Sequence, residues 1–451
     1  MSRFIPADRQ TGFLLPPSLD DWLPEGHLAR FVVEVIEQLD LSELTRRYAG
    51  RGSAAHHPAT LLGLLIYGYA TGVFSSRKIE RATYDSLAFR FIAANTHPDH
   101  DTIATFRRRF LPQVEALFVQ VLQLAREMKL LKLGAIALDG SKVKANASKH
   151  KALSYAHAQK LEVQLQDEVS ALMRLAEAAD HTPVPDGMDV PAEIARRQAR
   201  LAALAEAKAR IEARAQERLA TEQQEYEAKQ AKRQAQRDAG KKPRGKGPKP
   251  PKSGPGGQDQ VNLTDEESRI MPKSGGGFEQ SYNVQAGVDT KTMLVVSAQV
   301  TQATNDKRQV APTLEKLQAL PASLGRVSHL LADTGYFSGA NVEACEEHGI
   351  EPLLAMKREA HHLPVFERFA PDAPVVETAD AVQRMAQRLK TKAGRALYAL
   401  RKQCVEPVFG IIKQAMGFRQ FSLRGLENVS GEWSLVTLAW NIKRLNVLRG
   451  A

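Results

Sequence analysis

The sequence predicts a mixed α/β core that follows an all-helical N-terminal region and is interrupted by a long helical insertion. Short apolar segments bounded by turn residues, a pattern typical of buried strands, occur at 136–146 and resume at Tyr282. Between them the composition shifts to Ala, Glu, Gln, Lys and Arg, with apolar residues at helical spacing. Because the strand pattern stops before this charged segment and resumes after it, we interpret the segment as an insertion.

Length and charge limit the possible functions. The chain has 451 residues, of which 43% are hydrophobic, and a formal net charge of +11. A protein this basic often binds a polyanion, most commonly nucleic acid, although ribosome or membrane-surface binding would also suit it. Cys345 and Cys404 have no paired spacing, so neither a disulfide framework nor a Cys-based zinc site is predicted. No signal peptide or membrane-spanning run is readable, and we expect a cytoplasmic protein without a membrane partner.

Residues 1–132 are predicted to form a helical, DNA-binding domain. Gly72 separates an apolar helix from a basic one, and further helices are expected to start near Asp101 and Val114. Several short helices with basic turns suit a helix-turn-helix-like module. An ordinary helical bundle with solvated arginines would give the same pattern. The candidate DNA-binding residues of this domain are Arg77, Lys78, Arg107, Arg108 and Arg109.

Residues 150–238 are predicted to form an antiparallel helical hairpin that turns near Pro183 and Pro185. Its apolar seam consists of Leu165, Val169, Leu172, Ala176, Ile194, Leu201, Leu204 and Ile211. Residues 239–260 form a basic Pro/Gly linker, which we expect to be disordered without a partner and able to follow DNA phosphates.

The core begins at 133–149 and continues through 261–451. Its first strand is predicted to end at Asp139, because Asp and Gly both favour turns. A later strand ends in the same way at Asp333, with Gly335 close behind. Strand–Asp–Gly is common in ordinary turns, so one such carboxylate alone indicates little. Two of them at strand ends are candidates for a shared metal site.

The order of the predicted strands indicates an RNase H-like α/β fold, with a mixed five-stranded sheet and flanking helices. The five strands are predicted at 136–138, 282–288, 293–300, 327–332 and 351–356. In that fold the first and fourth strands are neighbours, which would bring Asp139 and Asp333 together.

A third acid is predicted on a C-terminal helix. Since Pro is tolerated in the first turn of a helix, Pro407 indicates a helix start near Val405. Glu406 and Lys413 are two turns apart and share a face. Glu406 can complete a metal site, with Lys413 beside it to meet a phosphate. The basic turn that follows supplies another candidate DNA contact, Arg419.

Three carboxylates suit two hard cations such as Mg2+ or Mn2+, which prefer oxygen ligands. Two such ions, roughly 3.5–4 Å apart, activate an attacking oxygen and stabilise a leaving one. Here water would cut a DNA strand, and the freed 3′-hydroxyl would then attack another phosphodiester. Asp289 and Asp306 are alternatives for the second acid, but we interpret Asp289 as the start of a hairpin and Asp306 as a helix cap.

Further stretches along most of the chain carry a more specific signal. They are His57-Pro-Ala-Thr-Leu-Leu, Tyr67-Gly-Tyr, Ser75-Ser-Arg, Pro98-Asp-His-Asp-Thr-Ile, Phe106-Arg, Leu138-Asp-Gly-Ser-Lys, Asn262-Leu-Thr-Asp, Ser268-Arg-Ile-Met, Gly277-Phe, Tyr282-Asn-Val-Gln-Ala, Ala332-Asp-Thr-Gly-Tyr-Phe and Val405-Glu-Pro-Val-Phe-Gly. With the three acids, these stretches resemble bacterial insertion-sequence DDE transposases, in the subgroup whose third-acid motif is Tyr, Arg, Glu, Lys.

The resemblance implies catalytic, metal-binding roles for Asp139, Asp333 and Glu406. The accessory motif positions are Tyr398, Arg401 and Lys413, of which Arg401 is a candidate DNA contact. The family motif leaves three residues between Arg and Glu, whereas here Arg401 leaves four and Lys402 leaves three.

The function implied is DNA transposition by a nucleoid-associated bacterial enzyme. Its partners would be the terminal inverted repeats and target DNA, with a homodimer assembled on the DNA. Two alternatives keep the same fold: a DNA-binding protein of transposase origin that is no longer catalytic, and a metal-dependent nuclease without strand transfer.

Overall fold

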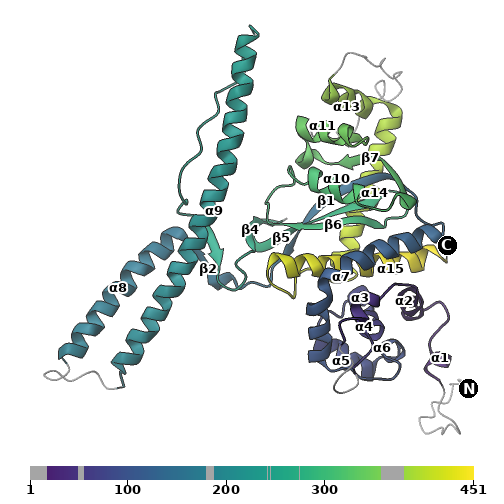
Figure 1. Ribbon diagram of the computed structural model, residues 1–451, viewed down its shortest axis with the longest axis horizontal. Helices are drawn as coiled ribbons and strands as arrows, with labels where there is room; N and C mark the ends of the chain where they lie inside the picture. Colours follow the sequence, from purple (N-terminus) through teal and green to yellow (C-terminus); the bar gives the residue numbers. More distant parts are fainter. Residues whose placement is uncertain are drawn as a thin grey trace, which may run out of the picture. The chain divides into compact units, whose positions relative to one another are not determined.

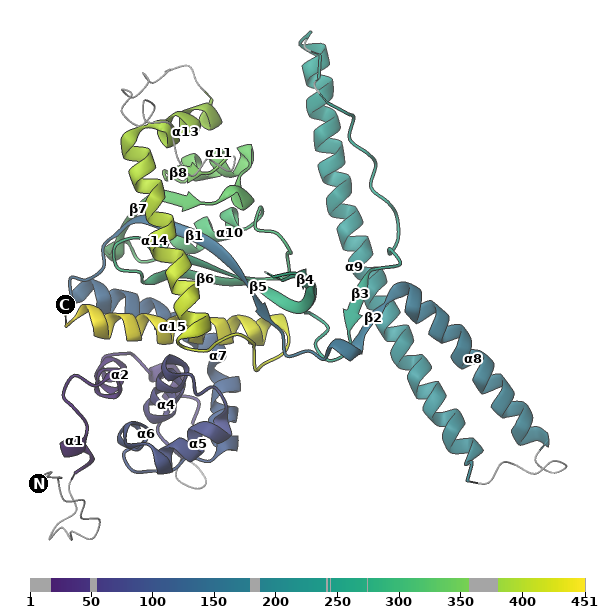
Figure 2. The same ribbon diagram turned by 180° about the vertical axis from the view of Figure 1, so that it is seen from behind.

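The chain folds into two compact units, shown from opposite sides in Figures 1 and 2. One unit comprises Met1–Ala145 and Tyr282–Ala451, and the other comprises Asn146–Ser281. The computed structural model describes residues 18–48, 55–178, 187–240, 242–243, 245–273, 275–356 and 380–450. The predicted turn at Pro183 and Pro185 lies outside the described residues.

The N-terminal region is helical, as predicted. Its helices are α1 (Leu19–Trp22), α2 (Leu28–Glu37), α3 (Ser42–Thr45), α4 (Pro58–Thr71), α5 (Ser76–Asp85), α6 (Leu87–Ile92) and α7 (His100–Glu127). Gly72 ends α4 with a left-handed φ of 86°, a conformation that favours glycine. No single helix among the described residues is long and apolar enough to cross a bilayer, and the bent pair α4 and α5 reaches that length and composition jointly.

Helix α7 corrects the prediction of two helices in this stretch. It runs unbroken through Pro112, whose missing N–H leaves the carbonyl of Arg108 without its helical donor. Arg108 is exposed, so water can satisfy that carbonyl. The apolar stripe of Phe110, Leu111 and Val114 is buried on both sides of the proline. Burial of this stripe therefore carries the helix through a residue that would ordinarily end it.

The core sheet has the RNase H-like arrangement predicted from the strand order. Its strands are β1 (Leu133–Lys144), β5 (Phe278–Asp289), β6 (Val295–Thr301), β7 (Gly325–Ala332) and β8 (Glu351–Leu354). In space they follow the order β6, β5, β1, β7, β8. Strand β7 is parallel to both β1 and β8, whereas β6 is antiparallel to β5. An additional short strand, β4 (Arg269–Pro272), pairs with Phe278–Ser281, the part of β5 that belongs to the second unit.

Helices cover the sheet. They are α10 (Val310–Gln318), α11 (Gly339–Glu347), α13 (Ala381–Lys390), α14 (Lys392–Gln414) and α15 (Leu426–Leu448). Helix α14 packs on β1 and β7, and Figure 2 shows it crossing one face of the sheet. Helix α15 packs against α7, α4 and β6, and its Trp433 is 1% exposed. The N-terminal helices and the sheet therefore share one core.

Helix α14 also corrects the prediction that a helix starts near Val405. It begins at Lys392 and contains Pro407 in its interior. The carbonyl that loses its donor belongs to exposed Gln403. Buried Val408 and Ile412 hold the following turns against the core, which compensates for the lost hydrogen bond.

The second unit is built on a helical hairpin, as predicted. Helix α8 (Tyr155–Ala178) pairs with α9 (Val190–Asp238), and β2 (Ala152–Ser154) pairs antiparallel with β3 (Gln260–Asn262) at its base. Its buried core consists of Leu153, Ala158, Leu165, Leu204, Ala207, Ile211 and Val261. Of the predicted seam residues, Leu165, Leu204 and Ile211 are buried, and Val169, Leu172, Ile194 and Leu201 are partly buried. Ala176 is exposed, so the prediction was wrong for that residue.

The basic linker departs from the predicted disorder, since its described residues lie along α9 (Figure 1). The Arg233 guanidinium donates to the carbonyl oxygens of Gly245 and Lys246, at 2.8 and 2.9 Å. At the other end Arg218 bonds the Asp259 carboxylate at 2.8 Å. Backbone carbonyls and one acid therefore attach the linker to the helix.

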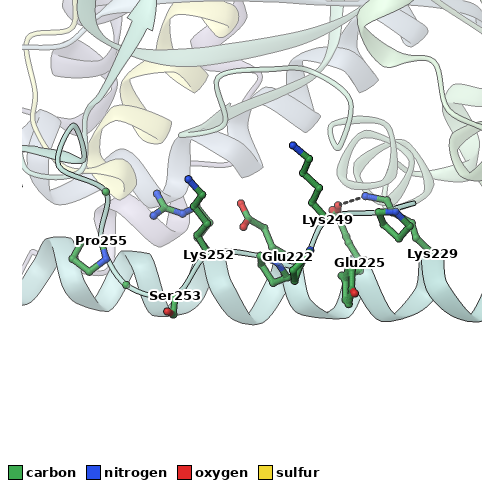
Figure 3. A pocket seen from close by; sticks show the side chains of 14 residues that line it. Glu222, Glu225, Lys229, Lys249, Lys252, Ser253 and Pro255 are labelled. Atoms are coloured by element: carbon green, nitrogen blue, oxygen red, sulfur yellow. Dashed lines mark hydrogen bonds and ion pairs between the residues drawn. The ribbon is translucent and has the colours of Figure 1, made fainter. Parts of the chain in front are cut away.

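The linker and α9 enclose an open groove of about 670 Å³. Figure 3 shows Glu222, Glu225 and Lys229 of α9 on one side of it, and Lys249 and Lys252 of the linker on the other. Its lining mixes both signs of charge.

Candidate active site

Asp139 lies within β1 rather than at its end, which corrects the predicted strand boundary. The strand continues through Gly140 to Lys144. A Cβ at Gly140 would lie 2.3 Å from Gln285 Nε2 and 2.7 Å from Asp306 Oδ1. The glycine is therefore explained by the close approach of these side chains and not by a turn.

We predict that Gly140→Ala destabilises the protein by about 1–3 kcal/mol, because the methyl group overpacks the site. Urea unfolding measures the change. Gly134→Ala is the matched control, since Gly134 lies in the same strand and an added Cβ there meets nothing within 4 Å. Equal effects of the two substitutions would contradict the close-packing explanation.

Asp333 follows β7 directly, as predicted. Its carboxylate caps the short 3-10 turn Thr334–Tyr336 by accepting the Gly335 N–H at 2.8 Å. The parallel register of β1 and β7 pairs Ala137 with Leu331. Asp139 and Asp333 each come two residues after this pair, which places them at corresponding points on neighbouring strands.

Helix α14 brings Glu406 and Arg401 to the same place. Arg401 Nη1 lies 3.3 Å from Asp139 Oδ2, and Arg401 Nη2 lies 3.0 Å from Glu406 Oε1. Arg401 is 7% exposed, whereas Lys402 is exposed. Of the two candidates for the basic motif position, Arg401 is the one that contacts the acids. Tyr398, partly buried one turn earlier, interacts electrostatically with it.

The charge environment shows that the acids are close enough to interact. Burial, reinforced by the negative charges of Asp333 and Glu406, raises the pKa of Asp139 to about 6. The Gly140 N–H and the Arg401 guanidinium oppose this rise. Like charges that raise a carboxyl pKa in a half-buried site are a feature of functional acids.

The donor set fits divalent cations by its chemistry. Three carboxylates provide hard oxygen ligands. Asp333 and Glu406 repel Asp139 and contribute to its raised pKa, and a bound cation would reduce this repulsion. In the described part of the chain, no three His, Cys, Asp or Glu side chains are grouped so as to hold a metal ion. The Arg401 guanidinium instead bonds both Asp139 and Glu406.

Lys413 reaches the same site from the next part of α14. Its ammonium donates to Ser141 Oγ at 2.5 Å and to the Lys142 carbonyl oxygen at 2.9 Å. Burial lowers the pKa of Lys413, and the charge of Lys142 lowers it further. Arg419 is exposed, and its Nε donates to the Lys413 carbonyl oxygen at 3.0 Å.

The basic candidates of the N-terminal region divide into surface and core residues. Arg77 and Lys78 are exposed on α5, and Arg108 and Arg109 are exposed on α7. Arg107 is 9% exposed and points into the core.

Arg107 takes part in a buried polar cluster. Its Nη1 donates to the Phe74 carbonyl oxygen at 2.9 Å and to the Tyr69 hydroxyl at 3.2 Å, and Tyr69 donates to Glu432 at 2.8 Å. We therefore no longer count Arg107 among the candidate DNA contacts.

Asp306 is the site residue that sequence reasoning misinterpreted. It does not cap α10, whose N-cap is Gln309. Its Oδ1 instead accepts the Asn283 and Gln285 side-chain amides, each at 2.7 Å. The available signal was the pair Asn283 and Gln285 among the apolar residues of the second half of β5, since buried amides need partners. Asp289, by contrast, accepts Thr292 N–H at 2.9 Å in the hairpin that was predicted for it.

Comparisons with known families found two matching models. Residues 246–442 match the model of the transposase DDE domain, and residues 17–109 match a transposase domain model (DUF772). Asp333 and Glu406 fall within the first match, and Asp139 lies between the two. No curated protein and no solved structure matches the chain. DDE transposase domains act on DNA and generally use divalent metal ions. The chain therefore belongs to the insertion-sequence transposases that carry a DDE domain.

Proposed function

We propose that this transposase binds the terminal inverted repeats of its element and carries out metal-dependent strand cleavage and strand transfer through Asp139, Asp333 and Glu406. The observation that carries the proposal is that Asp333 at the end of β7 and Glu406 on α14 both act electrostatically on Asp139 of β1, and that Arg401 bonds Asp139 and Glu406. The proposed partners are the inverted repeats and target DNA, with a homodimer assembled on the DNA.

The three acids would hold Mg2+ or Mn2+, and two ions, when bound, would activate the attacking oxygen and stabilise the leaving one. The chain's own residues prepare the site for this chemistry. Arg401 offsets the charge of Asp139 and Glu406 and orients both carboxylates. Lys413 presents an ammonium next to Ser141, where it can meet a DNA phosphate. Below about pH 6 Asp139 holds a proton, which weakens it as a cation ligand.

A strand-transfer assay tests the proposal. It combines the full chain with donor DNA ends, a plasmid target and Mg2+. We expect cleaved ends that become joined to the plasmid. Cleavage without a joined product would indicate a metal-dependent nuclease, and end binding without metal-dependent cleavage would indicate a DNA-binding protein without catalysis.

The DNA-binding role proposed for Arg77 and Lys78 predicts a change in salt dependence. Arg77→Ala and Lys78→Ala should each lower the slope of log affinity against log salt by about 1, because each phosphate contact releases a counterion. Fluorescence anisotropy with an inverted-repeat duplex measures the slope. Arg46→Ala is the control, since Arg46 is exposed and already paired with Glu43 at 3.0 Å. An unchanged slope in both test variants would remove α5 from the proposed interface.

Substitutions of Arg401 and Lys402 test which of the two residues occupies the Arg position of the third-acid motif. Arg401→Ala should lower cleavage by about 10- to 100-fold, because Arg401 directly contacts two proposed ligands. Lys402→Ala should stay close to wild type, since Lys402 is exposed. Cleavage rates at saturating DNA measure both. A larger loss in Lys402→Ala would reverse the assignment.

A further inference from the structure

A buried polar network lies behind Asp139, on the side of β1 that faces away from α14. Successive side chains of a strand point to opposite faces. Asp139 faces Arg401 of α14, so the Cα of Gly140 faces the other way, where Gln285 and Asp306 cover it. The proposed catalytic acid thus has a second carboxylate directly behind its own strand.

Asp306 is the acceptor on which this network converges. Its Oδ1 accepts from Asn283 Nδ2 and Gln285 Nε2, both at 2.7 Å, and lies 3.8 Å from Lys142 Nζ. Asn283 and Gln285 are 0% and 1% exposed. Hydrogen bonds to an ionised acceptor are about twice as strong as neutral ones, so Asp306 fixes the orientation of both amides.

The Gln285 amide then connects Asp306 to the segment that carries Asp333. Gln285 Oε1 accepts the hydroxyl of Tyr336, which is fully buried three residues after Asp333. A second link joins the same segments: Asn341 Nδ2 donates to the carbonyl oxygens of Lys307 and Tyr336, at 2.7 and 2.6 Å. The loop of Asp306 and the turn of Asp333 are therefore held together on both sides.

We propose that Asp306 is a positioning residue of the active site. Through Gln285 and Tyr336 it holds the turn after β7 against the Gly140 segment of β1, and thereby sets the placement of Asp333 relative to Asp139. The inference rests on the proposed metal-dependent function of these acids. Loss of such a supporting partner typically costs about 10- to 100-fold in metal affinity.

Mn2+ binding to the full chain, followed by the electron paramagnetic resonance signal of free Mn2+, tests the proposal. Asp306→Ala and Tyr336→Phe should each weaken Mn2+ binding by about 10- to 100-fold. Asp306→Asn should recover part of that loss, because its amide oxygen can still accept from Gln285. In strand cleavage the variants should lower kcat and leave the KM for DNA close to wild type, since Asp306 is not proposed to contact DNA.

Two references make the result decisive. Asp289→Asn changes an acid of β5 that is 1% exposed, whereas the Asp306 side chain is 26% exposed. It should leave Mn2+ binding unchanged; an equal loss there would show general destabilisation and overturn the proposal. Asp139→Ala should abolish the binding measured. If it does not, the proposed metal site itself is wrong.

The outcomes for the remaining variants separate the two proposals. If Asp139→Ala loses Mn2+ while folded Asp306→Ala and Tyr336→Phe bind like wild type, only the positioning role of Asp306 is overturned. Circular dichroism checks folding. If Asp306→Ala does not fold, Tyr336→Phe decides the question, because it removes a single hydroxyl and keeps the ring in place.

Discussion

Replacing Asp139, Asp333 or Glu406 by alanine is expected to lower strand cleavage and strand transfer by at least about 10³-fold. Each carboxylate is proposed to hold the cations that neutralise charge in the transition state, and such stabilisation amounts to several kcal/mol, where roughly 4 kcal/mol corresponds to that rate loss. Single-turnover cleavage of an inverted-repeat end in Mg2+ measures the effect. Binding of the same end, measured separately, should stay close to wild type.

The control for these variants is Glu315→Ala, which removes an exposed acid from α10. It makes the same change of charge away from the site and should retain full activity. Wild-type cleavage in any one of the three alanine variants would remove that residue from the proposed triad.

Asp139→Asn is expected to stabilise the metal-free protein at pH 7.5, even though it inactivates the enzyme. Burial, together with Asp333 and Glu406, raises the pKa of Asp139 from 3.8 to about 6. Between these values the folded protein binds more protons than the unfolded chain, so the free energy of unfolding of the wild type falls as pH rises. Above about pH 6 the full cost, about 3 kcal/mol at most, is present. Below pH 3.8 it vanishes, since the group is protonated in both states.

Urea unfolding in EDTA at pH 4 and pH 7.5 measures this difference. Asp139→Asn should exceed the wild type at pH 7.5 and approach it at pH 4. Mg2+ should stabilise the wild type but not the variant, because a ligand that binds the folded state shifts the equilibrium toward it. A variant less stable than wild type at pH 7.5 would contradict the electrostatic cost assigned to Asp139.

The order of strands and helices was predictable because it depends on local patterns. A short apolar run next to turn residues marks a strand, as in β7, where Leu330, Leu331 and Ala332 precede Asp333. The end of α4 at Gly72 was also predictable, since few residues other than glycine adopt the left-handed conformation found there. These signals lie within a few residues of the feature they predict, and they sufficed for the RNase H-like plan.

Contacts between distant segments decided what local patterns could not. The sequence predicts helix starts near Val114 and, from Pro407, near Val405, yet buried neighbours carry α7 through Pro112 and α14 through Pro407. Arg107 had the same sequence appearance as Arg108, and only the packing of α7 against Tyr69 separates a core arginine from a surface one.

In the active site too, some features follow from local sequence and others from contacts between distant segments. The sequence alone determined which acids are candidates, because Asp139, Asp333 and Glu406 each stand in a local context that could be recognised. The tertiary structure decided how Asp139 is held, since Gly140 serves a close approach by Gln285 and Asp306 from segments far along the chain. It also brought Arg401, rather than Lys402, to the acids. The physical reason is that a side chain's partner and burial depend on what packs against it, and this is set by segments more than a hundred residues away.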